Sequence, residues 1–478
     1  MKLGQTSVIY VIAKIAASFA GFLATIYFTR TLGEEVYGYY AVTLALVSWL
    51  GLVKSVGFGT ALVKKMSEGE RSDAYFIAAS VIILCLTILT CGIVLLFNQQ
   101  IDDYIGQPVS DLVIFLLIST VIVELVNSGL KGAHKVHIYA PLNTLKEILK
   151  SLFMVALVAV GFELIGMLLG YALGTLLIGF FGLYVIRPRL VIPKWSDFTS
   201  LFDFAKYAWL GSMRSKSFNE VDILILGFFV SSGLTGIYAV AYSLSKFLEI
   251  FGKGIQSTLL PEMSKLSVED EYGTISELTN KSITFAGLFL IPGFIGSAVL
   301  GDRLMSIYGP GFDVGDRILV LLIFAILLYT YNRQLLNTLK AIDMPELAFR
   351  ANAIFILSNV SLNGLLIWQI GWYGAAIATT LSAAIGLVSG YYYIRGRISI
   401  SIQYHEIGCQ WIAALLMGGV VYGARAVGEE TAVAPYNEVF VVLLVGLGAG
   451  VYFLTYLAIS TTFRDTVRRN LPVDVPGL

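Results

Sequence analysis

The chain has 478 residues, of which 57 % are apolar and only 13 % are charged, and its formal net charge is zero. A soluble protein normally carries charge on about a quarter of its residues, so this composition, with a mean hydropathy of +0.80, predicts a polytopic membrane protein. The zero net charge gives no general attraction to nucleic acid. The connections between apolar segments are too short for a separate soluble domain and no phosphate-loop motif is present, which argues against ATP hydrolysis within the chain.

The apolar segments set the expected fold. A helix needs about 20 residues to cross the hydrocarbon of a bilayer, and on that criterion we predict an all-α integral membrane protein with about fourteen transmembrane helices. The predicted spans begin near Thr6, Val36, Tyr75, Leu112, Leu142, Leu164, Ala205, Leu234, Ser282, Ile318, Ala351, Trp372, Ile407 and Val439. In the fifth span Lys146, Glu147 and Lys150 precede the uncharged part, so we expect them near a membrane interface or facing the protein interior. Residues 261–281 are expected to form a cytoplasmic amphipathic helix.

The lysine and arginine residues outside the spans predict the orientation of the chain, because cytoplasmic segments are enriched in them. Most of these residues lie in segments that are cytoplasmic when the amino terminus is cytoplasmic. Both termini are therefore expected on the cytoplasmic side of an inner, cytoplasmic membrane.

The residues that often hold metals or form disulfides give no such signal here. Cys85, Cys91 and Cys409 all lie in apolar runs, where buried thiols are expected. His134 and His137 have no third metal ligand beside them. We therefore expect no metal site and no cofactor.

An internal repeat indicates the domain organisation. The stretch Gly38–Leu46 recurs as Gly236–Leu244, and both copies open a predicted span, the second and the eighth. The repeat predicts two six-helix lobes of the same membrane orientation, related by a pseudo-twofold axis along the membrane normal. The expected segments are an amino-terminal lobe at 1–190, a carboxy-terminal lobe at 191–396, and spans 13 and 14 with a cytoplasmic tail at 397–478.

Charged residues inside the predicted spans point to a polar cavity. A charge near the middle of a bilayer costs about 3 kcal/mol on insertion scales, so these side chains are expected to face a protein interior or water rather than lipid. Most of the cations lie in the first two spans of each repeat, as a cavity between two lobes requires. The predicted substrate-binding residues are Lys14, Lys54, Arg214, Lys216, Lys246, Lys253 and Arg333.

The carboxylates inside the spans are candidates for coupling to a proton or sodium gradient. Glu124 and Asp222 have no obvious partner at helical spacing, which makes them the better candidates. Glu220 and Glu249 are open to a second interpretation, in which they neutralise Lys216 and one of Lys246 and Lys253.

Small residues on one face of the sixth span suggest either close helix packing or a path for a lipid tail. These residues are Gly166, Gly170 and Gly174. Close packing is the more common use of such a face, and we expect it here.

Several short motifs together carry a resemblance to a known family. They are Leu32-Gly33, Tyr37-Gly38 and Tyr40-Ala41 at the entry to span 2, Leu260-Pro261 and Met263-Ser264 after span 8, Tyr308-Gly309 and Phe312, Asn359 and Asn363 in span 11, and Gly371, Gly374, Ala378 and Thr379 at the entry to span 12. With these motifs spans 1–12 resemble the polysaccharide-type members of the multidrug/oligosaccharidyl-lipid/polysaccharide exporter superfamily.

The resemblance implies two six-helix lobes in a V shape and no enzymatic activity. It implies a flippase that moves a polyprenyl-linked glycan from the inner to the outer leaflet by alternating access, coupled to a proton or sodium gradient or to the membrane potential. Its partners would be the lipid-linked glycan and membrane lipids. The chain is expected to act as a monomer, which can associate with glycan assembly enzymes.

Three other functions stay open at this point. A cation-coupled multidrug antiporter of the same superfamily would present acidic and aromatic residues to its cavity, whereas cations outnumber carboxylates within these spans. A glycan polymerase or ligase would carry a sizeable outside loop, and the outside carboxylates Asp302, Asp313 and Asp316 are expected only to cap helices. A receptor or channel would not need a two-lobe repeat.

Overall fold

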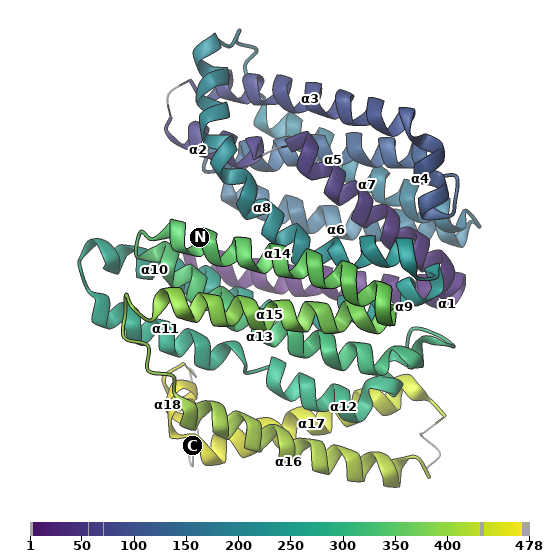
Figure 1. Cartoon of the computed structure of the whole chain (residues 1–478), viewed down its shortest axis with the longest axis vertical. Coiled ribbons are helices and arrows are strands. Elements are labelled where there is room, and N and C mark those ends of the chain that lie inside the picture. The colour runs from purple at the N-terminus through teal and green to yellow at the C-terminus, as the bar shows by residue number, and fades with distance from the viewer. Residues whose placement is uncertain (1–2, 56, 70, 431–434, 471–478) are drawn as a thin grey trace. The chain divides into compact units, whose positions relative to one another are not determined.

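The computed structural model describes residues 3–55, 57–69, 71–430 and 435–470. Within these ranges, the backbone alone is described at 3–17, 53–55, 136, 207–216, 250–251, 253, 255–258, 261, 268 and 469–470. The described part of the chain consists of α-helices and one short 3-10 helix and contains no strand, as the all-α prediction requires (Figure 1).

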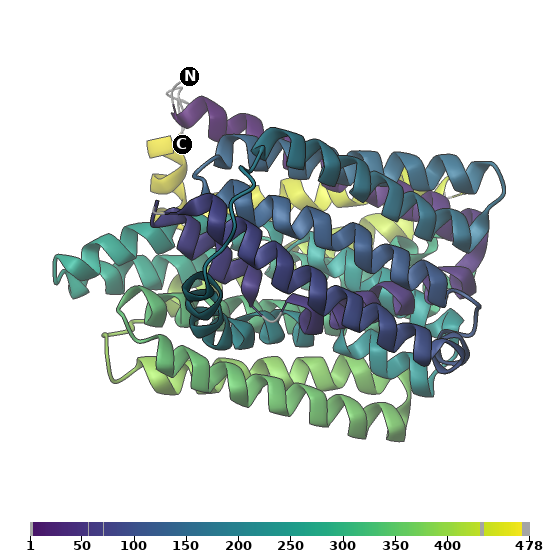
Figure 2. The same cartoon turned by 90° about the horizontal axis from the view of Figure 1, so that it is seen from above.

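The chain forms two compact units, Met1–Ala239 and Val240–Leu478. The helices of the first unit are α1 (Leu3–Ser55), α2 (Phe58–Ser67), α3 (Ser72–Leu96), α4 (Asn98–Ile105), α5 (Ser110–Gly132), α6 (Val136–Ala159), α7 (Glu163–Ile186) and α8 (Trp195–Phe229), followed by the start of α9 (Ser232–Phe247). Within this unit the long helices run roughly parallel or antiparallel to one another (Figures 1 and 2). The predicted division at 190 and 396 stays a prediction.

The second unit holds the rest of α9 and the remaining helices. These are α10 (Ile250–Val268), α11 (Tyr272–Ala286), α12 (Leu290–Ser306), the 3-10 helix η1 (Phe312–Gly315), α13 (Asp316–Ala341), α14 (Pro345–Ile370), α15 (Trp372–Ile394), α16 (Tyr404–Gly428), α17 (Asn437–Ile459) and α18 (Thr461–Asn470). The expected cytoplasmic helix at 261–281 is wrong. The segment is not one helix, because residues 261–268 end α10, a turn at 269–271 with Asp270 at φ 57° follows, and residues 272–281 begin α11. Its cytoplasmic location stays a prediction.

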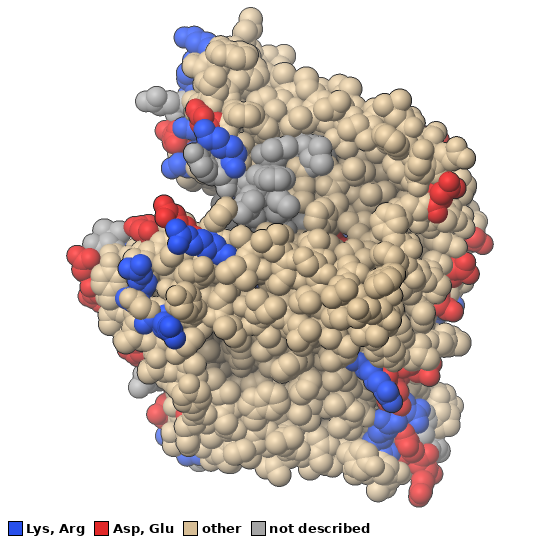
Figure 3. Space-filling model, in the orientation of Figure 1, with Lys and Arg blue, Asp and Glu red and all other residues tan. Residues whose placement is uncertain are grey.

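Eight of the predicted spans are long and apolar enough to cross a membrane within the described residues. They are α3, α5, α7, α11 with α12, α14, α15, α16 and α17. The remaining predicted spans, in α1, α6, α8, α9–α10 and α13, carry polar or charged residues within them, so the total of fourteen stays a prediction. On the face drawn in Figure 3, charged side chains gather at the ends of the helices and leave an uncharged band between them, as a membrane-embedded surface requires.

Several of the long helices are interrupted. In α1 the backbone at Gly33 has φ 80°, which separates two helical segments at the predicted turn between spans 1 and 2. Only glycine adopts this conformation at low cost. The predicted eighth span is divided into α9 and α10 at Leu248 and Glu249, and the ninth into α11 and α12 at residues 287–289. Non-helical backbone at membrane depth is tolerated only where it is buried in protein or lines a water-filled cavity.

The glycine face of α7 packs closely against α6, as predicted. A Cβ atom on Gly170 would lie 2.5 Å from the backbone of Met154, and one on Gly174 would lie 2.6 Å from the Cα atom of Lys150. These glycines therefore let the two backbones approach each other, which is how small residues join membrane helices.

The two glycines that open the sequence repeat lie against each other in the first unit. A Cβ atom on Gly38 of α1 would lie 1.9 Å from the carbonyl oxygen of Ser232. One on Gly236 of α9 would lie 2.1 Å from the carbonyl oxygen of Glu34 and 2.9 Å from the backbone nitrogen of Gly38. The two helices thus cross in backbone contact at equivalent positions of the repeat.

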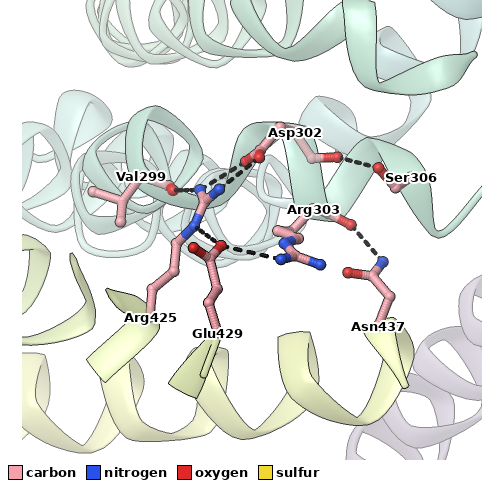
Figure 4. Close-up of polar contacts among 7 residues, drawn as sticks. All are labelled: Val299, Asp302, Arg303, Ser306, Arg425, Glu429 and Asn437. Atoms are coloured by element: carbon pink, nitrogen blue, oxygen red, sulfur yellow. Dashed lines mark hydrogen bonds and ion pairs between the residues drawn. The ribbon is translucent and has the colours of Figure 1, made fainter. Parts of the chain in front are cut away.

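Helix α16 is joined to α12 by a charged cluster, and Asn437 of α17 donates to the Arg303 carbonyl oxygen of α12 (Figure 4). The Arg425 guanidinium donates to both carboxylate oxygens of Asp302, at 2.7 and 2.8 Å, and to the carbonyl oxygen of Val299 at 2.6 Å. Arg303 and Arg425 both donate to Glu429, at 3.1 and 2.9 Å. The expectation that the Asp302 side chain caps a helix is wrong, because a guanidinium from α16 offers that carboxylate two charge-assisted hydrogen bonds.

Glu429 makes this cluster sensitive to pH. It follows the end of α16, and the hydrogen bonds from Arg425 and Arg303 hold its pKa below the ordinary value of 4.5. A lowered folded-state pKa means that the stabilisation is present above pH 4.5 and is lost as the pH falls through the lower value. We expect Glu429→Gln to lower the melting temperature slightly at neutral pH, since exposed ion pairs contribute little, and to match wild type in strong acid.

The control for this measurement is Glu430→Gln, because Glu430 is an exposed neighbour of the same type. Its melting temperature should follow wild type at every pH. A difference between Glu429→Gln and wild type that stays constant down to strong acid would contradict the assignment of the effect to the Glu429 carboxylate.

Candidate functional site

A buried ion pair in the second unit is the central feature of the candidate site. The Arg333 Nη1 atom of α13 lies 2.5 Å from the Glu249 Oε1 atom, and the two residues are 8 % and 2 % exposed. Arg333 lies about two turns from the nearer end of α13. Glu249 is therefore neutralised by Arg333, a residue 84 positions away that the second interpretation did not name. The pairing with Lys246 or Lys253 stays a prediction.

The break between α9 and α10 positions Glu249. Leu248 and Glu249 donate backbone hydrogen bonds to residues three positions earlier, Ser245 at 3.3 Å and Lys246 at 3.1 Å, which tightens and ends α9. Glu249 is then the residue immediately before α10. The carboxylate thus lies at a helix interruption and not along a regular helix face.

Arg333 keeps free hydrogen-bonding capacity. Among the described residues, its Nε and Nη2 atoms have no hydrogen-bond partner, although both are buried. A Cβ atom on Gly252 of α10 would lie 3.5 Å from Arg333 Nη2 and 2.7 Å from the Thr330 side chain, so the glycine leaves room beside the guanidinium. A guanidinium with unused donors can bind a phosphate oxygen.

Lys246 lies one turn before Glu249, near the end of α9. Its side chain is half-buried, and its Nζ atom is 4.8 Å from the centre of the Tyr242 ring. A tyrosine face attracts an ammonium group. Lys246 and Arg333 are thus the two predicted cations whose side chains the structure describes, and Glu249 follows Lys246 within one turn.

The carboxylates of the first unit occupy different surroundings. The Tyr238 hydroxyl of α9 donates to the Asp222 Oδ2 atom of α8 at 2.5 Å, and both side chains are buried. Glu220 is half-buried on the same helix. The half-buried Glu124 of α5 faces α2, since a Cβ atom on Gly59 would lie 3.3 Å from its carboxylate.

Five of the predicted cavity residues have side chains outside the described part of the structure. These are Lys14, Lys54, Arg214, Lys216 and Lys253. Their place in a cationic cavity stays a prediction.

The structure also identifies polar residues that the sequence analysis did not assign to a site. Beside Arg333, which the sequence analysis had already assigned, the carboxy-terminal half of α13 carries buried polar residues: Thr330, Asn332, Gln334, Asn337 and Thr338. The sequence signal that could have identified these residues was the high density of amide side chains in the predicted tenth span. In the first unit, Lys146, Glu147 and Lys150 of α6 form a joined charged group beside Tyr171 of α7.

Comparisons with known proteins agree with the predicted family. The family model described as polysaccharide biosynthesis protein matches residues 3–267, and the model of the lipid II flippase MurJ matches residues 147–440. The probable flippase AglR of Haloferax volcanii is 30 % identical over 98 % of each chain. The probable low-salt glycan biosynthesis flippase Agl15 of the same organism is 28 % identical over 100 % of each chain.

Solved structures agree at the level of the fold. The lipid II flippase MurJ in an inward closed conformation matches with a TM-score of 0.79 and 18 % identity, over 96 % of this chain and 100 % of that one. An inward-facing transporter of the multidrug resistance MATE family matches with a TM-score of 0.64 and 14 % identity, over 80 % and 94 %.

Both relatives are named as probable flippases, which supports the prediction of a transporter rather than an enzyme. They are similar over the whole chain, so the resemblance extends beyond spans 1–12. The chain is therefore a multi-pass membrane protein that belongs to the polysaccharide biosynthesis protein family, among the flippases of the multidrug/oligosaccharidyl-lipid/polysaccharide exporter superfamily.

Proposed function

We propose that the protein is a flippase that moves a polyprenyl-(di)phosphate-linked oligosaccharide or polysaccharide precursor across the cytoplasmic membrane by alternating access, for the synthesis of cell-surface glycans. The observation that carries this proposal is similarity over the whole chain to two relatives named as flippases, one of them named for glycan biosynthesis. The cargo combines a polar glycan, an anionic phosphate and a long lipid tail.

The physical demands of this cargo match the chain. The glycan must cross hydrocarbon, which needs a hydrated path, while the lipid tail can stay in the bilayer. The phosphate needs cations held inside the protein. Arg333 has buried donor atoms without a hydrogen-bond partner among the described residues, and Lys246 lies one turn from the partner of Arg333, Glu249. These two residues are our best candidates for phosphate contact.

The energy source and sidedness belong to the same proposal. Transport is coupled to a proton or sodium gradient, or it is driven by the membrane potential. Asp222 is the first carboxylate to test for coupling, because it is buried and accepts a hydrogen bond from the Tyr238 hydroxyl. Both termini lie in the cytoplasm. The protein acts as a monomer and meets glycan assembly enzymes at the membrane.

A leaflet assay tests the proposal. Purified protein is placed in liposomes that contain a fluorescent polyprenyl-diphosphate oligosaccharide, and the label that reaches the opposite leaflet is counted. Wild type should move the label, and Lys246→Ala should slow it about tenfold, because a charge-assisted hydrogen bond to phosphate is lost. Lys216→Ala tests the same role for a predicted cavity residue whose side chain lies outside the described part of the structure.

The matched control is Lys206→Ala. Lys206 is an exposed lysine that pairs with Asp203 on the same helix, so its replacement should leave the rate near that of wild type. A wild type that moves no lipid-linked glycan, but exports a cationic dye under an ion gradient, would replace this function with the antiporter alternative. An unchanged rate in Lys246→Ala would remove Lys246 from the phosphate site and keep the function.

A further inference from the structure

The first unit contains a second polar group at membrane depth, which we name the lysine–tyrosine cluster. Its members are Lys146, Glu147 and Lys150 of α6, Tyr37 and Tyr40 of α1, and Tyr171 of α7. The Lys146 Nζ atom lies 2.9 Å from Glu147 Oε1, and Lys150 donates to Glu147 Oε2. The Lys150 Nζ atom is also 4.9 Å from the centre of the Tyr171 ring. One carboxylate is therefore held between two ammonium groups, and one of these lies over an aromatic face.

The helices on either side bring the tyrosines to this group. Gly174 lets α7 approach the Lys150 backbone, which places Tyr171 beside the ammonium group. The Tyr40 hydroxyl is 4.0 Å from the sulfur of Met154, one turn beyond Lys150 on α6. The rings of Tyr37 and Tyr40 lie 5.7 Å apart. Three helices of one unit thus build the cluster.

The depth of the cluster decides what its exposed atoms can face. Lys150 lies more than two turns from either end of α6. The Glu147 side chain is 37 % exposed, while those of Lys146 and Lys150 are 18 % and 19 % exposed. A charged group facing hydrocarbon at this depth costs about 3 kcal/mol or more. We therefore infer that the open side of Glu147 faces water rather than hydrocarbon, where a ligand can reach it.

The mixture of groups indicates the chemical class of that ligand. The ammonium groups donate hydrogen bonds and the carboxylate accepts them, so the cluster suits hydroxyl groups, which do both. A bare phosphate would meet the repulsion of Glu147, which also neutralises one of the two ammonium charges. Tyrosine rings add flat apolar faces with a polar tip. A sugar ring has the matching form, with hydroxyl groups around its edge and apolar C–H groups on its face.

We propose that the lysine–tyrosine cluster is a sugar-binding subsite, which holds the glycan part of the cargo in the first unit. This proposal rests on the proposed flippase function for the identity of the cargo. It separates recognition of the glycan, by Glu147, Lys150 and Tyr171, from contact with the phosphate, by cations elsewhere.

Binding of two probes to the full-length protein in nanodiscs tests the subsite. One probe is a fluorescent polyprenyl-diphosphate oligosaccharide, and the other is the same lipid diphosphate without sugar. Lys150→Gln and Tyr171→Leu should each weaken binding of the glycosylated probe about tenfold, because a hydrogen-bonding or stacking partner is lost. Both variants should bind the sugar-free probe as wild type does. Tyr171→Phe keeps the ring and should retain most of the affinity.

Two matched controls and a folding check accompany the variants. Lys64→Gln changes an exposed lysine that makes a long ion pair with Glu68, and Tyr184→Leu changes an exposed tyrosine on α7; neither should alter binding of either probe. Size-exclusion profiles and melting temperatures identify a variant that has not folded. If Tyr171→Leu fails this check, Lys150→Gln still decides the result.

The outcomes separate the subsite from the flippase function. If the variants lose the same affinity for both probes, the cluster binds phosphate and the proposal is overturned. If the variants bind the glycosylated probe as tightly as wild type does, the cluster is only a structural ion group and the proposal is also overturned. Wild type that binds the glycosylated probe through the cluster, but does not move it between leaflets, would uphold the subsite and overturn the flippase. If wild type binds the glycosylated and the sugar-free probe with the same affinity, the subsite proposal is overturned even if transport is observed.

Discussion

Arg333→Leu is expected to lower the free energy of unfolding by about 3–5 kcal/mol, because it leaves Glu249 as a buried charge without its guanidinium partner. The loss should be visible as a large decrease in melting temperature in detergent or nanodiscs. The double variant Arg333→Leu with Glu249→Leu should recover most of the stability, since replacing a whole buried pair by apolar groups is often close to neutral.

The same variants separate stability from transport. The double variant lacks the Arg333 donors, so it should fold and still move lipid-linked glycan poorly if the guanidinium contacts phosphate. Lys281→Ala is the control, because it removes an exposed ion pair with Glu277 and should cost less than about 1 kcal/mol. A double variant as unstable as Arg333→Leu would show that the loss does not come from the Glu249 carboxylate.

Gly38→Ala and Gly236→Ala are expected to have the next largest effect. Each added Cβ atom would clash with a backbone carbonyl oxygen, at 1.9 Å from Ser232 and 2.1 Å from Glu34, where real Cβ atoms stay beyond 3.0 Å. The crossing helices must therefore separate, and we expect each variant to lose about 2–3 kcal/mol. Thermal unfolding of the purified variants measures the loss. The double variant should lose less than the sum, because both changes open the same crossing.

Gly92→Ala is the matched control for the crossing. Gly92 lies in α3, and a Cβ atom there would meet nothing within 4 Å. Alanine is the better helix former, so this variant should be as stable as wild type or slightly more stable. If Gly38→Ala behaves like Gly92→Ala, the backbone contact between α1 and α9 does not contribute to stability.

The sequence predicted those features that depend on local composition. Uncharged apolar runs such as 75–96 and Trp372–Ile394 are recognisable because every residue in them must be compatible with lipid. The close packing of α7 on α6 was predictable for the same reason, since Gly166, Gly170 and Gly174 repeat along one helix face. The family was recognisable from short motifs spread along the chain.

The partners of the buried charges could not be predicted from local composition. Helical spacing reveals only contacts within one helix, whereas Glu249 pairs with Arg333 84 residues away and Asp222 accepts from Tyr238 across the turn between two helices. Neither residue at the break, Leu248 or Glu249, is a glycine or proline, so the sequence gives no local signal that the helix ends there. Tertiary contacts determine these features, and for that reason the sequence left Lys150 of α6 open between a membrane interface and the protein interior.

The contact between Gly38 and Gly236 has a consequence for how the chain can change over evolutionary time. These glycines occupy the same position in the two copies of the repeated stretch, and each needs the other to remain small. A larger side chain in either copy would displace the backbone of the other. Each copy therefore limits which substitutions the other copy can accept at this crossing. This is the part of the chain where the two copies of the repeat are still similar in sequence.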